Sequence, residues 1–242
     1  MPATIINCAL ILLGSFFGLL LKNKISRRFT DTITQGLGLC VLGIGITSAI
    51  ATENTLCVIV CMVLGTLLGE ALKIEDRLDT LGDLLKAKFA KEGDSGNFTQ
   101  GFVTASLLFC IGAMAVVGSI DAGIRGDYSI IISKGVIDGV SAISFAAAMG
   151  MGVAFAAVPV LLYQGGLTLL AGVVGGFLST AVITEMGATG GAIIIGLGIN
   201  MLELGSRRIK VGNMLPAIFL PLLYLPVSQA LIGYFSSHSL FG

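Results

Sequence analysis

The chain has 242 residues, of which 55% are hydrophobic and only 12% charged, and its 14 basic and 14 acidic side chains cancel. In a soluble domain about a quarter of the residues are charged. The composition therefore excludes an ordinary water-soluble domain and indicates a membrane protein. The sequence contains no basic tract, so we expect no nucleic-acid partner.

Eight apolar segments are each close to the ~20 residues that a helix needs to cross the hydrocarbon of a bilayer. They cover residues 3–21, 35–52, 55–72, 98–120, 128–156, 159–180, 187–203 and 212–235. Lys22 and Lys24 follow the first segment, which is the reverse of a cleavable signal peptide. We therefore predict an all-α integral membrane protein with about eight transmembrane helices and a retained first span.

The charges of the connections alternate along the chain. Lys and Arg follow the first, third and seventh spans, whereas residues 51–54 and 179–187 contain neither and residues 121–127 contain only Arg125. Because basic loops stay in the cytoplasm, this pattern predicts both termini outside a multi-pass protein of the cytoplasmic membrane. Segment 128–180 is less clear, since no charge orients its inner turn, and a re-entrant segment also fits there.

Two connections have the pattern of amphipathic helices. Apolar residues recur every three or four positions among charged ones, at Ile25, Phe29 and Ile33 and again at Ile74, Leu78, Leu81, Leu85 and Phe89. Such helices lie on a membrane surface, and we place both on the cytoplasmic face. The second fits equally well as a helix that docks on its own bundle or on a neighbouring protomer. Residues 91–96 (KEGDSG) then form a predicted polar turn.

Glycines recur at four-residue spacing in three apolar segments, at residues 14–18, 65–69 and 172–176. This spacing lets helices approach closely in lipid, so we expect glycine-rich faces at helix interfaces, including those of a homo-oligomer. An Ile-Gly or Leu-Gly pair follows each patch on the next helix, and the charge pattern inverts the third unit relative to the first two. Inverted repeats are common in secondary transporters, but glycine-rich helices also match by chance.

Residues 1–242 form one predicted polytopic domain, in which residues 1–127 are glycine-rich and residues 128–242 carry intramembrane polar side chains. Lys134 and Asp138 are one helical turn apart, so they share a face with Ser141 and can neutralise each other. Asp138 lies about 15 Å into its span, near the midplane. A carboxylate there fits the coupling of an ion or proton. The alternative is a structural ion pair, although such a pair gains little over apolar packing.

Further polar residues follow in the last three spans. Gln164 and Thr168 lie beside two glycines, where they either contact a solute or bond across helices. Glu185 is either a gate or proton acceptor, or an acid at a solvated helix N-terminus. Asn200 and Asn213 flank the last cytoplasmic turn. Three prolines after Asn213 leave helix carbonyls free, which fits coordination of a cation or solute, or a kinked but inert helix.

No pattern indicates an enzyme, a cofactor or a metal site. His238 is the only histidine, and no Ser–His–Asp or HExxH arrangement is present. The glycine-rich residues 187–191 lack the strand and lysine of a phosphate-binding loop. Cys57 and Cys61 share a helix face, which a metal or redox pair requires, but small buried hydrophobic residues are the favoured interpretation of the cysteines.

Several motifs resemble, in order, a bacterial family of multi-spanning inner-membrane proteins of the YdfK/YqgA type, which is known chiefly as a domain of unknown function. The resembling segments are Lys134-Gly135 with Asp138-Gly139, Pro159-Val160-Leu161 with Tyr163-Gln164-Gly165, Glu185-Met186, Gly196-Leu197-Gly198-Ile199-Asn200, Val211-Gly212-Asn213-Met214-Leu215-Pro216, and the pattern from Gly14 to Glu70. The resemblance covers nearly the whole chain and departs at Gly212, where the family pattern has alanine. It implies a bacterial membrane protein that is generally taken for a transporter, and it implies no substrate.

We therefore expect a secondary transporter or permeation protein that carries a small polar solute or ion across the lipid bilayer. The expected site residues are Lys134, Asp138, Ser141, Ser144, Gln164, Thr168, Glu185, Asn200 and Asn213. In this hypothesis Asp138 couples, Lys134 balances its charge, and the amides are neutral ligands. The alternative is a non-transporting scaffold or accessory subunit in which these residues only tie helices together.

Overall fold

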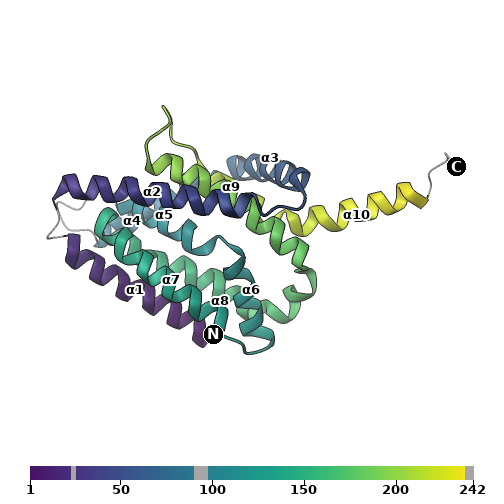
Figure 1. The fold of residues 1–242 in the computed structure, drawn as a ribbon, viewed down its shortest axis with the longest axis horizontal. Helices are drawn as coiled ribbons and strands as arrows, with labels where there is room; N and C mark the ends of the chain where they lie inside the picture. The colour runs from purple at the N-terminus through teal and green to yellow at the C-terminus, as the bar shows by residue number, and fades with distance from the viewer. Residues whose placement is uncertain (23–25, 90–97, 238–242) are drawn as a thin grey trace.

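The computed structural model describes residues 1–22, 26–89 and 98–237, and these ranges contain helices and no strand (Figure 1). In chain order the helices are α1 (Pro2–Lys22), α2 (Arg27–Ala49), α3 (Thr55–Leu72), α4 (Ile74–Phe89), α5 (Phe98–Cys110), α6 (Ala113–Ile124), α7 (Ser129–Met149), η1 (Met151–Ala156), α8 (Ala157–Val174), η2 (Gly175–Phe177), α9 (Thr180–Met201), η3 (Val211–Phe219) and α10 (Pro221–Ser237). Lys24, Ile25, His238 and the predicted turn at 91–96 lie outside the described residues.

Six of these helices are long and apolar enough to cross a membrane, and two bent helix pairs raise the number to eight if each pair is one span. Large apolar side chains are exposed on the outside of the bundle, as lipid contact requires; Leu162 and Val173 are 71% and 70% exposed. The prediction of an all-α membrane protein with about eight spans is confirmed. α7 and residues Met151–Val173 are each long and apolar enough to cross a membrane, so residues 128–180 contain two candidate spans.

The packed helix pairs run in the directions that the loop charges predict. α1 and α7 are parallel, because Gly14 lies against Gly139 and Gly18 against Ile143. α2 and α9 are antiparallel, and so are α3 and η3. In an eight-span chain of alternating direction, spans one and five run the same way, whereas spans two and seven, and spans three and eight, run oppositely. The observed pairings therefore fit the predicted order of spans.

Each of the three predicted glycine patches contains a glycine that makes a close contact within the chain. A Cβ on Gly14 would lie 2.0 Å from the Gly139 carbonyl oxygen, and a Cβ on Gly69 would lie 1.9 Å from that of Asn213. These positions bring α1 onto α7 and α3 onto η3, backbone against backbone. In the third patch a Cβ on Gly175 would lie 2.7 Å from Ile124 Cδ1 of α6, whereas Gly172 has no atom within 4 Å of where its Cβ would be and faces outward from the chain. The inverted repeat stays a prediction.

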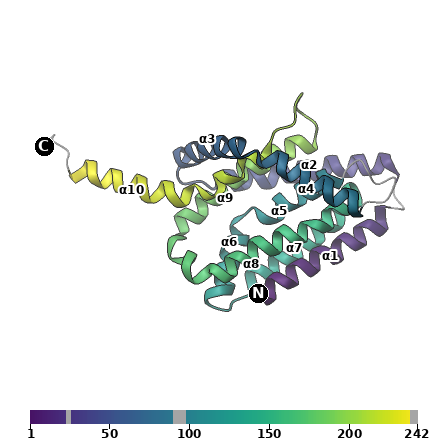
Figure 2. The same cartoon turned by 180° about the vertical axis from the view of Figure 1, so that it is seen from behind.

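The structure differs from the predicted spans where backbone geometry, not hydropathy, decides. Predicted span 98–120 is two helices, α5 and α6, bent by 60° around Gly112, whose φ of 135° disfavours side chains. The last span is also bent, by 46°, where η3 meets α10 at Pro221. Pro216 within η3 lacks the N–H that a helix donates, and η3 is a 3₁₀ helix. α10 then extends away from the bundle (Figure 2).

The first predicted amphipathic helix is not a separate element. Phe29 and Ile33 belong to the first turns of α2, which runs without a break from Arg27 to Ala49. The second, α4, docks on its own bundle, which was one of the two interpretations of its pattern. Its Gly82 contacts Thr99 of α5, and the rings of Phe89 and Phe155 lie 5.0 Å apart.

Candidate functional site

Lys134 and Asp138 form an ion pair inside the bundle, on the face of α7 that packs against α1 and α5. Lys134 is 6% and Asp138 5% exposed. The Lys134 ammonium group donates to Asp138 Oδ2, and it also donates to the backbone oxygen of Phe109 at 2.7 Å. Their one-turn spacing on α7 brings the two side chains together, as the sequence predicts.

Two buried amides complete what we call the polar cluster, which consists of Asn7, Lys134, Asp138 and Gln164. Asn7 Nδ2 on α1 donates to Asp138 Oδ2 at 3.2 Å and to Gln164 Oε1 on α8 at 3.0 Å. Asn7 and Gln164 are both 0% exposed. One amide group therefore joins three helices that are far apart in the sequence.

The polar cluster is not saturated by the protein's own hydrogen bonds. Asn7 Oδ1, an acceptor, and Gln164 Nε2, a donor, have no partner, and neither does the hydroxyl of Thr4 one turn earlier on α1. Thr168 does not supply one, because its hydroxyl donates to the Gln164 backbone oxygen at 2.8 Å. Buried polar groups normally have partners, since leaving one unpaired costs about 1–3 kcal/mol. The cluster can thus bind a further group that donates to Asn7 Oδ1 or accepts from Gln164 Nε2.

The polar cluster lies beside the break between α5 and α6. Phe109 is in the last turn of α5, where backbone oxygens have no N–H group of a following helical turn to accept from. The Lys134 ammonium group donates to the Phe109 oxygen instead. Gly112 caps the start of α6, which runs in a new direction. Broken helices that present free backbone groups to a site at mid-membrane are a common feature of secondary transporters.

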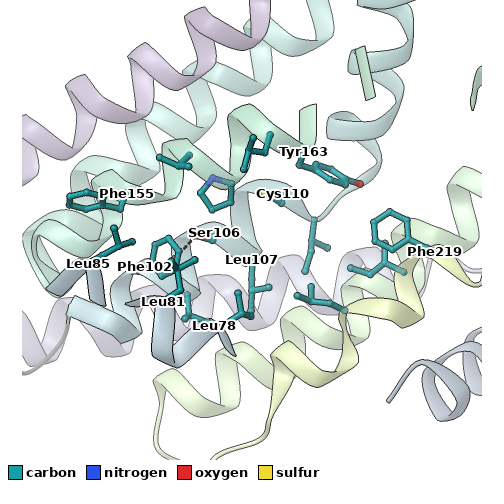
Figure 3. Close-up of a pocket in the computed structure, with 17 residues that line it drawn as sticks. Leu78, Leu81, Leu85, Phe102, Ser106, Leu107, Cys110, Phe155, Tyr163 and Phe219 are labelled. Atoms are coloured by element: carbon teal, nitrogen blue, oxygen red, sulfur yellow. Dashed lines mark hydrogen bonds between the residues drawn. The ribbon is translucent and has the colours of Figure 1, made fainter. Parts of the chain in front are cut away.

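An apolar cavity of about 450 Å³ lies between α4, α5, η1, α8 and η3 (Figure 3). Leu78, Leu81 and Leu85 of α4 form one wall, and Phe102, Leu107 and Cys110 of α5 form another. The hydroxyl of Ser106 is bound within its own helix, to Phe102 O at 2.6 Å. Cys110 and Tyr163 both line the cavity. Cys110 directly follows Phe109, whose backbone oxygen accepts from Lys134, and Tyr163 directly precedes Gln164 of the polar cluster. The cavity therefore adjoins the helix turns that carry the cluster.

The other predicted site residues lie apart from the polar cluster. Ser141 and Ser144 are half-buried on α7, and no hydrogen bond joins them to it. Glu185 is 1% exposed and binds the connection between α2 and α3. Its carboxylate accepts from the Thr52 hydroxyl at 2.6 Å and from the backbone N–H groups of residues 53 and 54 at 2.8 and 3.0 Å. It thus holds the N-terminal end of α3 against α9.

Asn200 and Asn213 serve two further connections. Asn200 exchanges two hydrogen bonds of 2.8 Å with the backbone of Ile209, which closes the loop after α9. Asn213 Oδ1 accepts from the Glu75 N–H at 2.7 Å, and Asn213 Nδ2 donates to Glu70 at 2.5 Å. Glu75 in turn accepts from the Gly212 N–H at 2.6 Å. Burial raises the pKa of the Glu75 carboxyl, and the Gly212 N–H and a nearby arginine oppose that shift.

The predicted site is therefore distributed over separate places, and only Lys134, Asp138 and Gln164 meet in one of them. Sequence reasoning missed Asn7, which comes from the half of the chain predicted to be only glycine-rich. The available signal was an amide within the first apolar segment. Cys57 and Cys61 do face each other, with their sulfur atoms 3.8 Å apart. Among the described residues, no group of three or more His, Cys, Asp or Glu side chains is placed to hold a metal.

The sequence profile of the family described as "Protein of unknown function (DUF554)" matches residues 2–225. The chain belongs to the DUF554 family. It is 31% identical to the uncharacterized membrane protein YdfK of Bacillus subtilis (strain 168) over 234 residues, 95% of this chain and 98% of the relative. It is 30% identical to the uncharacterized protein YqgA of Escherichia coli (strain K12), over 96% of this chain and 97% of the relative. No solved structure matches. The DUF554 match includes every residue of the polar cluster, and the resemblance seen in the motifs is confirmed.

Proposed function

We propose that the protein is a secondary transporter or permeation protein for a small polar solute or ion, which binds at the polar cluster. The observation that carries the proposal is the pairing of a buried Lys134–Asp138 ion pair with unpaired amide atoms on Asn7 and Gln164. A buried ion pair contributes little to stability compared with apolar packing, and unpaired buried polar atoms lower stability further. Stability therefore does not account for this arrangement, whereas binding of a solute does.

The broken helix supports the proposal. A transporter must open its site to one side of the membrane and then to the other, which requires elements that can move. The α5–α6 break lies beside the cluster, and the apolar cavity next to α5 leaves space on one side of it. In this state the cluster is closed, since Asn7 and Gln164 are fully buried. Transport therefore requires α5 to shift away from Lys134.

We further propose a bacterial inner-membrane protein that acts as a homo-oligomer and not as an enzyme. The loop charges and the membrane relative from Bacillus subtilis support the location. Gly36 and Gly43 on the exposed face of α2 support oligomer formation, because nothing lies within 4 Å of their Cβ positions. Small residues that face lipid allow a second copy to approach closely.

The sealed cluster also favours the second candidate function, a non-transporting scaffold. Glu185, Asn200 and Asn213 each bind backbone groups of a connection, as structural residues do. If the polar cluster has the same role, Lys134 and Asp138 join α7 to α1 and α5 and nothing passes between them.

Flux through reconstituted protein separates the two. Proteoliposomes that contain wild type, Asp138→Asn or Asp31→Asn are assayed for uptake of protons, Na⁺, K⁺ and a panel of small polar metabolites. Asp31 is an exposed residue of α2, so it controls for loss of one carboxylate. We expect uptake of at least one solute by wild type and Asp31→Asn and a loss of at least about tenfold in Asp138→Asn. A folded Asp138→Asn protein with wild-type uptake of every solute, or no uptake by wild type, supports the scaffold.

A further inference from the structure

The polar cluster already holds an ammonium group, that of Lys134. An ammonium has three N–H donors and no acceptor. This one donates to two acceptors, Asp138 Oδ2 and the Phe109 backbone oxygen. A further acceptor, Asn7 Oδ1, belongs to the amide that donates to Asp138 Oδ2, and it has no partner. The cluster thus provides more acceptors than the Lys134 side chain uses.

The apolar cavity adjoins the same acceptors. Cys110, which lines the cavity, directly follows Phe109, whose backbone oxygen accepts from Lys134. Tyr163, which also lines it, precedes Gln164. A volume of about 450 Å³ is within the range of small-molecule sites. A ligand that reaches from the cavity past the end of α5 would contact both an apolar wall and the oxygens around the Lys134 ammonium.

The cavity is bordered by side chains on the outer surface of the bundle. Val158 and Leu162 are 55% and 71% exposed, and Phe219 is 44% exposed, on a surface that lipid covers in a membrane. A molecule with an apolar body can therefore reach the cavity from the bilayer as well as from water. The apolar side chains of the cavity cannot replace the hydration shell of a small ion, so they would not contribute to binding one.

We propose that the solute of the polar cluster is an organic ammonium with an apolar body, a primary amine whose carbon chain or ring occupies the apolar cavity. Its amino group takes the place of the Lys134 ammonium against Asp138, Phe109 O and Asn7 Oδ1. This inference depends on the proposed transport function and adds the chemical class of the ligand. Because one carboxylate balances one positive charge in a low-dielectric site, the ligand and Lys134 exclude each other.

Three probes separate the parts of the ligand. Hexylammonium has both an ammonium head and an apolar chain, hexan-1-ol has the chain alone, and methylammonium has the head alone. Each is titrated into purified protein in nanodiscs, and the shift of the thermal unfolding midpoint gives an apparent affinity. We expect hexylammonium to bind at least about tenfold more tightly than either partial probe, since only it gains both the ionic contact and the apolar burial.

Three variants locate the binding. Asp138→Asn removes the carboxylate, and Ser106→Phe places a ring in the cavity beside Phe102. Ser133→Phe makes the same substitution on an exposed position of α7 and is the matched control. We expect hexylammonium affinity to fall at least about tenfold in the first two and to stay at the wild-type value in the control. If Asp138→Asn does not fold, Ser106→Phe and the three probes still test the proposed ligand class.

Equal affinity for hexan-1-ol and hexylammonium would overturn the proposal, because the cavity would then hold any neutral chain, such as a lipid acyl chain. Unchanged hexylammonium affinity in Ser106→Phe would also overturn it. If Asp138-dependent flux of another solute is found and hexylammonium neither binds nor competes, the ligand class is wrong and the transport function stands. If neither flux nor binding depends on Asp138, both proposals fail.

Discussion

We expect the buried Glu185 carboxylate to stabilise the fold by binding the connection between α2 and α3. The carboxylate is 1% exposed and accepts three hydrogen bonds from the connection between α2 and α3, at 2.6, 2.8 and 3.0 Å. Glu185→Ala removes all three acceptor contacts at once. Glu185→Gln keeps one oxygen for the two backbone N–H groups, and the hydroxyl of Thr52 can turn to accept from the new amide.

The expected loss follows from these contacts. A hydrogen bond to a charged group contributes about 1.5–3 kcal/mol. The connection is partly exposed, so water replaces part of what the two N–H groups lose, and the N–H of Asn54 keeps its 3.1 Å bond to the Thr52 hydroxyl. We therefore expect Glu185→Ala to lower the unfolding free energy by about 3 kcal/mol. For a chain of this length that is a drop of about 6–12 °C in the thermal midpoint.

The assay is thermal unfolding of wild type, Glu185→Ala, Glu185→Gln and Glu53→Ala in one detergent. Glu53 is in the same connection, and its exposed side chain makes it the matched control. We expect Glu53→Ala to stay within about 0.5 kcal/mol of wild type. Glu185→Gln should lose no more than about 1 kcal/mol, mainly its charge at the start of α3. The reasoning is refuted if Glu185→Ala behaves like Glu53→Ala, or if Gln destabilises as much as Ala.

Three further changes are expected to alter stability in the same detergent assay. Gly14→Ala places a Cβ 2.0 Å from the Gly139 oxygen and should cost about 1–3 kcal/mol, whereas Gly36→Ala, with open space, should cost nothing. Because burial raises the pKa of the Glu75 carboxyl, the native state keeps its proton at pH values where the unfolded chain has lost it. Stability therefore falls as the pH rises through the raised pKa. Glu75→Gln should flatten this dependence of the thermal midpoint on pH, measured from about pH 4 to 8. Ser106→Leu fills part of the apolar cavity and should raise the unfolding free energy by about 1–2 kcal/mol, and an unchanged midpoint would contradict it.

The spans were predictable from sequence because apolar length decides where a helix can cross lipid. The predicted bounds 55–72 coincide with α3, at whose start Asn54 accepts from the Cys57 N–H. The break at Gly112 was not predictable, since a glycine in an apolar run looks the same with either sign of φ. The start of α2 was misjudged because hydropathy marks the edge of the hydrocarbon and not the first hydrogen-bonded turn.

Within the candidate site, the sequence predicts contacts that are local in the chain. Lys134 and Asp138 meet because one helical turn fixes their spacing. Asn7 meets Asp138 only because glycines let α1 pack closely along α7, and no local pattern contains that pairing. Glu185 and Asn213 were predicted as site residues because an apolar sequence gives no sign of the backbone groups that bind them. A polar residue in a span is therefore identified by sequence, and its partner by the fold.

The packing around the polar cluster determines which helices can move if the protein transports. α1 and α7 meet through backbone contacts at Gly14 and Gly18, where a single added carbon would overlap the partner helix. Such a pair moves as a unit, so Asn7 and Asp138 keep their distance. On the opposite side, the end of α5 contacts the cluster through one backbone oxygen, that of Phe109, and has the apolar cavity behind it. Exchange of a ligand for the Lys134 ammonium therefore requires motion of α5 and α6 against the fixed α1–α7 pair, and a cross-link between α5 and α7 should stop flux where one between α1 and α7 does not.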